Sequence, residues 1–141
     1  MANINAKSVV AGGLVAGLII NVSETILNLH VLGEQNDAAL SARNLPPVGG
    51  GAIAAFIAGG FGVGLLLMWL YAAMRPRFGA GPKTAVLTAL AVWLLAFAWP
   101  SLTTSLMGFL PAKLLTVTAI WGLGEIVIAA LAGGWLYKEH P

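Results

Sequence analysis

Four long apolar runs alternate with short polar stretches along this chain of 141 residues. An α-helix needs about 20 such residues to cross the hydrocarbon core of a bilayer, and each run is long enough. Prolines and glycines between the runs end one helix and begin the next. The pattern predicts an all-α fold, an integral membrane four-helix bundle in a single domain, with helices at about residues 7–32, 48–74, 83–104 and 112–137.

The polar stretches predict the connections. Residues 33–47 form a polar loop whose middle, residues 38–44, is expected to make a short surface helix with Asp37 as its N-cap. Residues 75–82 indicate a tight basic turn. Pro100 leaves two alternatives open, because its missing backbone donor either ends the third helix or kinks it.

The first apolar run carries a row of polar and small residues. At about 100° per residue on a helix, one stripe contains Gly13, Gly17, Asn21, Glu24, Thr25 and Asn28. Ser23 and His30 fall on the opposite side. Small residues mark a face where another helix approaches closely, so the carboxyl and both amides are expected to point into the protein.

The fourth run carries a similar stripe with a second carboxyl, formed by Thr118, Trp121, Gly122, Glu125, Ala129 and Ala132. Counting about 1.5 Å per residue from the basic ends puts Glu125 and Glu24 at similar depth. A charged side chain is costly there, and no Lys or Arg is predicted beside them, so at least one carboxyl is expected to hold a proton. We predict one intramembrane polar network of Asn21, Glu24, Thr25, Asn28, Thr118 and Glu125.

The predicted network leaves two alternatives. As a structural clamp, it would join neighbouring helices through hydrogen bonds. As a functional site, it would carry a proton or a cation or take part in catalysis, because an ionisable group inside a membrane span is a functional hypothesis in itself.

Small residues also predict which helix faces pack closely. The predicted positions are Gly13 and Gly17 on the first run, Gly51, Ala55, Gly59 and Gly62 on the second, and Gly122 on the fourth. Gly60 and Gly64 form a GxxxG pattern besides. Such a pattern serves either packing within the chain or dimerisation, and we expect the former.

Composition narrows the class of protein. Hydrophobic residues make up 59% of the chain and charged residues 9%, whereas a soluble domain has about 25% charged residues. The absence of cysteine excludes disulfides, thiolate nucleophiles and cysteine metal sites. The chain has only two histidines, His30 and His140, and these are too few for a metal site without cysteine ligands. We therefore expect no metal, and we also expect no catalytic residues and no cofactor. No basic cluster indicates a nucleic-acid partner.

The basic residues predict the orientation in the membrane, because they favour the cytoplasmic side of short loops. Five of the seven would lie on the side of the termini: Lys7, Arg75, Arg77, Lys83 and Lys138. Both termini are therefore expected to be cytoplasmic in a multi-pass membrane protein. An aromatic belt is expected at the same surface, formed by Trp69, Tyr71, Trp135 and Tyr137.

Short matches between the halves predict an internal repeat. Residues 7–10 (KSVV) match residues 83–86 (KTAV), Leu45-Pro46 matches Leu110-Pro111, and the WLY at 69–71 recurs at 135–137. The bundle would then consist of two repeated transmembrane hairpins with the same orientation.

Four segments carry a resemblance: residues 21–24 (NVSE), 69–79 (WLYAAMRPRFG), 81–85 (GPKTA) and 121–125 (WGLGE). Together they are similar to a group of small bacterial membrane proteins of unknown function. The resemblance would cover nearly the whole chain. It implies a bacterial inner-membrane setting and nothing about activity.

The polar parts of the chain are too short to form a separate domain, and this limits where the protein can act. The chain is expected to act within the lipid bilayer as a non-enzymatic interaction or accessory subunit, in a homo-oligomer or a larger membrane complex. The alternative is a small transporter or channel subunit that moves a proton or a cation through Glu24 and Glu125.

Overall fold

The computed structural model describes residues 4–139, and every regular element in that range is a helix. The elements follow in the order α1 (Ala6–Ile26), η1 (Leu27–Val31), α2 (Gly33–Ser41), α3 (Gly50–Phe78), α4 (Pro82–Trp93), η2 (Leu94–Ala98), α5 (Trp99–Leu106) and α6 (Ala112–Leu136). The two elements marked η are π-helical.

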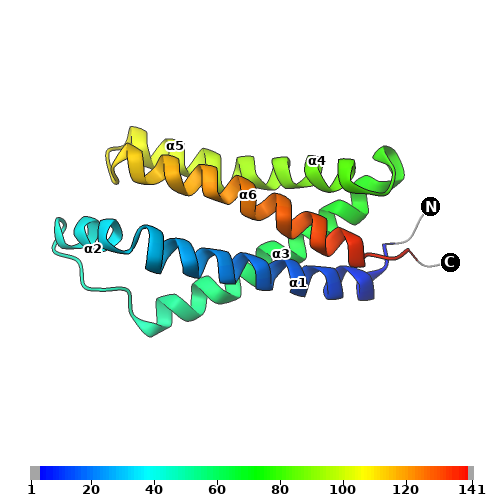
Figure 1. The fold of residues 1–141 in the computed structure, drawn as a ribbon, viewed down its shortest axis with the longest axis horizontal. Coiled ribbons are helices and arrows are strands. Elements are labelled where there is room, and N and C mark those ends of the chain that lie inside the picture. The colour runs from blue at the N-terminus through cyan, green and yellow to red at the C-terminus, as the bar shows by residue number, and fades with distance from the viewer. Residues whose placement is uncertain (1–3, 140–141) are drawn as a thin grey trace.

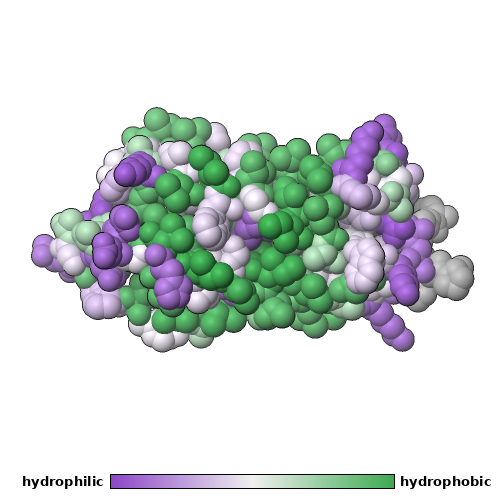
Figure 2. All heavy atoms as spheres, viewed as in Figure 1, coloured by the Kyte–Doolittle hydropathy of each residue, from purple (hydrophilic) through white to green (hydrophobic). Residues whose placement is uncertain are grey.

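Within residues 4–139, four helical stretches are long and apolar enough to cross a membrane: Ala6–Val31, Gly50–Phe78, Pro82–Leu106 and Ala112–Leu136. The predicted all-α class with four long apolar helices is therefore confirmed. Figure 2 shows apolar side chains over the middle of the visible face and hydrophilic ones gathered at its two ends. The short surface helix also exists, but α2 begins at Gly33, so Asp37 lies inside it rather than at its N-cap.

The long helices run back and forth between two ends of the molecule (Figure 1). At one end, here called the terminal end, α1 begins, α6 ends and α3 turns into α4. At the other, the loop end, lie α2 and the connections from α2 to α3 and from α5 to α6. α6 packs on α1 and on α4, and α1 also packs along α3. The middle of α6 is therefore covered by both halves of the chain.

Glycines let α1 approach both of its neighbours closely. A Cβ atom on Gly64 of α3 would meet the backbone nitrogen of Gly17 and would lie 2.5 Å from the carbonyl oxygen of Gly13. A Cβ atom on Gly12 would lie 2.7 Å from the carbonyl oxygen of Gly133 in α6. The GxxxG pattern therefore packs within the chain, and the predicted close contacts on α1 are confirmed.

The predicted packing face of α3 is wrong within this chain. Its residues are Gly51, Ala55, Gly59 and Gly62. All four are exposed, and a Cβ atom on any of the three glycines would meet nothing within 4 Å. α3 has small residues on two sides. The fully buried Leu67 and Met68 lie on the side that was not predicted to pack. Small residues alone could not distinguish the two faces.

Two π-helical segments interrupt the long helices. η2 comes directly before Pro100, which lacks a backbone donor. Because the helix widens there, α5 continues to Leu106, and Pro100 does not end the third span. Phe97 in η2 packs its ring against Gly122, which confirms the predicted close approach at that glycine. η1 begins three residues after Glu24, and π-helical segments are frequent at functional sites.

Candidate functional site

Glu125 is a buried acidic residue in the middle of α6. Its exposed fraction is 4%, and neither carboxyl oxygen has a hydrogen-bond partner among residues 4–139. The next residue, Ile126, is fully buried in the apolar core, so the helix holds the carboxyl at core depth. Leaving a buried polar group without a hydrogen bond costs about 1–3 kcal/mol. Such a group therefore needs an explanation in strain or in function.

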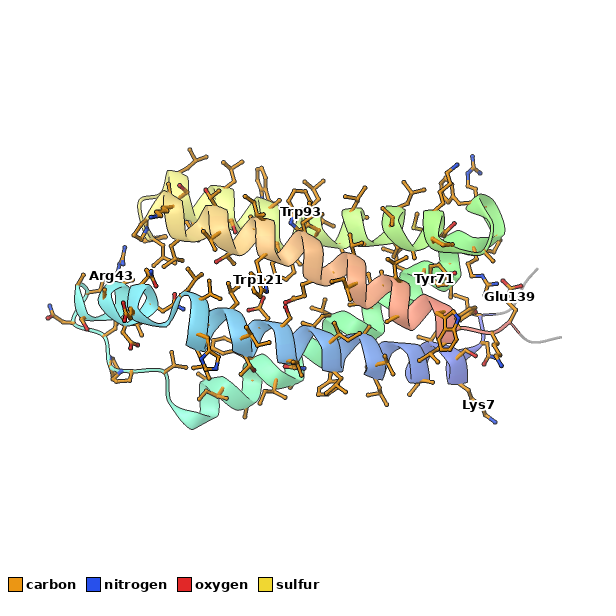
Figure 3. The ribbon with its side chains drawn as sticks, in the orientation of Figure 1. Lys7, Arg43, Tyr71, Trp93, Trp121 and Glu139 are labelled. Atoms are coloured by element: carbon orange, nitrogen blue, oxygen red, sulfur yellow. The ribbon has the colours of Figure 1, made fainter. Side chains whose placement is uncertain are left out.

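Helix α1 presents two polar side chains to this carboxyl, the Ser23 hydroxyl and the Glu24 carboxyl. Trp121, one turn earlier on α6, donates its indole N–H to Ser23 Oγ over 2.8 Å. Figure 3 shows the labelled Trp121 between the ribbons of α6 and α1. This hydrogen bond fixes the two helices to each other at the level of Glu125.

A file of polar side chains leads from Glu24 toward α2 and the loop end. Asn28 Nδ2 donates to Glu24 Oε2 over 2.8 Å and to the Glu24 backbone oxygen over 2.9 Å. Asn36 Nδ2 in α2 donates in turn to Asn28 Oδ1 over 3.2 Å. Asn28 is exposed, whereas Glu24 is half-buried. The file thus connects the region of Glu125 with the surface near the loop end.

Toward the terminal end, the surroundings of Glu125 are apolar. Ile126, Ala129 and Ala130 follow it on α6 and are fully buried in the same cluster as Met68 of α3. The hydrogen-bonded polar side chains of Asn28 and Asn36 lead from Glu24 in the other direction, toward the loop end.

Three of the six residues predicted to form the network come together: Glu24, Asn28 and Glu125. Asn21 turns instead toward α3, where its Nδ2 donates to the carbonyl oxygen of Ile57 over 3.2 Å. Including Asn21 in one network with Glu125 was therefore wrong. Thr25 and Thr118 donate to carbonyl oxygens of their own helices and do not join the network by hydrogen bonds.

Ser23 was placed on the wrong side by the sequence, because α1 has two neighbours rather than one. Gly13 and Gly17 lie against α3, whereas Gly12 lies against α6. Ser23 shares the second face, about 20° from Gly12 by helical periodicity. Gly12 and Ala16, spaced by four positions, were the sequence signal that could have identified this face.

A second polar cluster lies at the terminal end. The Arg75 guanidinium lies 5.8 Å from the ring centre of Tyr71 and 4.9 Å from that of Tyr137, and its Nε lies 3.4 Å from Glu139 Oε1. The two tyrosine rings meet edge to face with centres 5.9 Å apart. Both tyrosines are buried between helices at the terminal end. Trp69 and Trp135 are exposed, and the aromatic belt stays a prediction.

Each of these tyrosines binds the start of a helix. The Tyr137 hydroxyl accepts the backbone N–H of Asn5, the N-cap of α1, over 3.1 Å. The Tyr71 hydroxyl accepts the backbone N–H of Gly81, the N-cap of α4, also over 3.1 Å. The last helix of each half of the chain is thus joined to the first helix of the other half.

Metal binding finds no support in residues 4–139, where no group of three or more His, Cys, Asp or Glu side chains could hold an ion. His30 is exposed in η1. His140 lies outside the described residues. Comparison with family models, with curated proteins and with solved structures finds no match for this chain.

Proposed function

We propose that this chain is a multi-pass inner-membrane protein without enzymatic activity, and that it takes up a proton or a small cation at Glu125 as a transporter or channel subunit. The buried Glu125 carboxyl, without a hydrogen bond among the described residues, carries this proposal. A clamp would use its carboxyl oxygens in hydrogen bonds, as Glu24 does with Asn28. The unpaired Glu125 oxygens favour a binding role over a purely structural one.

Electrostatics support the same role. When ionised, the neighbouring carboxyls of Glu24 and Glu125 repel each other, and more strongly in apolar surroundings than in water. In the described part of the chain the ion pair that forms is Arg75 with Glu139, at the terminal end. A proton or cation taken up between the two carboxyls would therefore relieve a charge that no basic side chain balances.

Flux measurements on the purified protein in proteoliposomes test the proposal. With a proton-sensitive dye inside, or with a cation gradient imposed, the parent protein should dissipate the gradient and Glu125→Gln should not. Glu34→Gln is the matched control, because Glu34 is an exposed carboxyl in α2. Equal flux in the parent, Glu125→Gln and protein-free vesicles would refute a transport role.

The proposal includes an orientation in the membrane, with the terminal end on the cytoplasmic side. Lys7, Arg75, Arg77 and Lys83 lie at or next to the terminal end, in α1, α3 and α4. Basic residues favour the cytoplasmic face, so the polar file from Glu24 would open to the opposite side. The proposed subunit would thus receive its ion from outside the cytoplasm.

The two tyrosine contacts support the proposed internal repeat. Tyr71 and Tyr137 occupy the same place in the two WLY segments. Each binds the backbone N–H of the residue that caps the first helix of the other half. Two hairpins of the same orientation, related by an axis along the membrane normal, would produce this exchange.

An accessory role in a homo-oligomer or a larger membrane complex is the second candidate. It is favoured by the exposed face of α3 around Gly51, Gly59 and Gly62, where a foreign helix could approach the backbone closely. Light scattering in detergent, together with identification of copurified proteins, tests it. Gly59→Leu should release a partner without changing the fold. A chain that is monomeric and purifies alone in native lipid discs would exclude this role.

The resemblance to small bacterial membrane proteins of unknown function supports a bacterial inner-membrane setting for this chain.

A further inference from the structure

We infer that the species bound at Glu125 is a proton rather than a metal cation, with Ser23 as the positioning residue that serves the carboxyl in both of its states. This inference rests on the proposed uptake site and names its substrate. It is carried by the kinds of atom that surround the two carboxyls.

The groups around the carboxyl pair are hydrogen-bond donors more than cation ligands. Trp121 contributes an indole N–H, which can only donate. Asn28 turns its NH₂ group toward Glu24, and this orientation is determined by two acceptors, the Glu24 carboxyl and backbone oxygens. Its own oxygen accepts from Asn36. The Asn28 NH₂ group on Glu24 and the Trp121 N–H on Ser23 carry partial positive charge, which disfavours a metal ion beside them.

The α-helical backbone at the carboxyl pair offers few oxygens to a cation. Glu125 lies within α6, and Ser23 and Glu24 lie within α1, with the π-helical η1 beginning three residues after Glu24. Hard cations need several oxygen ligands, about six to eight for Ca²⁺. Cation sites in membrane transporters obtain such oxygens from unwound helices. Here the Glu24 carbonyl oxygen is engaged by Asn28.

No basic side chain supplies the missing charge from any packed helix. Lys7 at the start of α1, Arg75 and Arg77 in the last turn of α3, and Lys83 at the start of α4 all belong to the terminal end. Lys113 lies at the start of α6, about 18 Å along the helix from Glu125. The acidic group facing Glu125 is Glu24 on α1. Proton uptake forms one O–H bond on a carboxyl oxygen and removes one negative charge, with no other reactant.

Ser23 fits both forms of the carboxyl. A hydroxyl has one donor and two acceptor positions, and Trp121 N–H occupies one acceptor position. The Ser23 O–H must therefore point away from the indole, and the adjacent Glu125 can accept it when ionised. When Glu125 is protonated, the second acceptor position of Ser23 can receive its proton. A rotation of the hydroxyl, without any movement of the helices, suffices for both.

Infrared difference spectroscopy on the full-length protein in lipid nanodiscs tests this inference. A pH jump should change the C=O stretching band of one protonated carboxyl, and this band should be lost in Glu125→Gln but kept in Glu34→Gln. Ser23→Ala should shift the band to higher frequency, because the protonated carboxyl could no longer donate to the Ser23 oxygen as we infer, and Ser23→Thr should restore it. Choline chloride serves as the control salt. At constant pH, the chlorides of lithium, sodium, potassium and calcium should change the band and the melting temperature no more than choline chloride does.

The other outcomes separate the inference from the proposed function. If a metal chloride removes the band or raises the melting temperature, and this effect disappears in Glu125→Gln, the inference is overturned and the uptake site stands. If neither pH nor any salt changes the carboxyl signal, both fail. A band lost in Glu24→Gln and kept in Glu125→Gln overturns the assignment to Glu125. Should Glu125→Gln not fold, Glu125→Asp must shift the band rather than leave it unchanged.

Discussion

Adding one methyl group to Gly64 should force α1 and α3 apart. The Cβ atom of Gly64→Ala would lie 2.5 Å from the Gly13 carbonyl oxygen and 2.7 Å from the Gly17 Cα atom. Carbon atoms rest about 3.5–4.0 Å apart, so the two backbones must separate by roughly 1 Å where they cross. Both partners are backbone atoms of a packed helix, and neither can rotate out of the way.

The expected loss follows from overpacking, which costs typically about 1–3 kcal/mol in a closely packed core. Replacing glycine by alanine within a helix gains about 0.5–1 kcal/mol, because the unfolded chain loses freedom. Gly62→Ala isolates this gain, since its Cβ atom would meet nothing within 4 Å on the same helix. Gly62→Ala should therefore be slightly stabilising and Gly64→Ala clearly destabilising.

Unfolding of the two variants and the parent in the same detergent, followed by circular dichroism, measures the difference directly. Size-exclusion profiles confirm that each starts as the same species. If Gly64→Ala is as stable as Gly62→Ala, the helices do not cross at Gly64 and the packing of α1 on α3 is incorrect.

Three further predictions concern the terminal end, the buried carboxyl and the orientation. Tyr71→Phe and Tyr137→Phe should each lower the free energy of unfolding by about 1–3 kcal/mol, because a helix N-cap N–H loses its acceptor, and clearly unequal losses in the same unfolding assay would argue against equivalent roles. Glu125→Leu should leave stability unchanged or raise it, since an apolar side chain replaces an unsatisfied polar one of similar volume, and a large loss in melting temperature would show that the carboxyl acts as a clamp. Reporter fusions at Gly79 should be cytoplasmic and at Asp37 external, and the reverse result would invert the proposed direction of access.

Helix number, length and apolar character could be derived from sequence because they depend on neighbouring residues alone. The four long runs, separated by proline and glycine, correspond to the four stretches that could cross a membrane. The continuation of the third span through Pro100 could not be derived. It depends on the wider π-helical turn of η2, which proline permits but does not require.

Parts of the candidate site were also accessible from sequence. Glu24 and Glu125 stand out as acidic residues within apolar runs, and their similar depth follows from counting along each helix. Their proximity is confirmed by the structure. Ser23, in contrast, was placed away from the site, because helical periodicity puts it outside the stripe that contains Glu24.

Helical periodicity shows which residues share a face, but it does not show how many neighbours a helix has. α1 lies between α3 and α6, so Asn21 turns to one neighbour and Ser23 to the other. α3 has two faces of small residues, and only the course of α1 decides that Gly64 is covered while Gly62 is bare. The sequence by itself therefore determined the helices and the two acidic positions within them. The partner of each face was decided only by tertiary structure, because close packing depends on contacts between residues far apart in the chain.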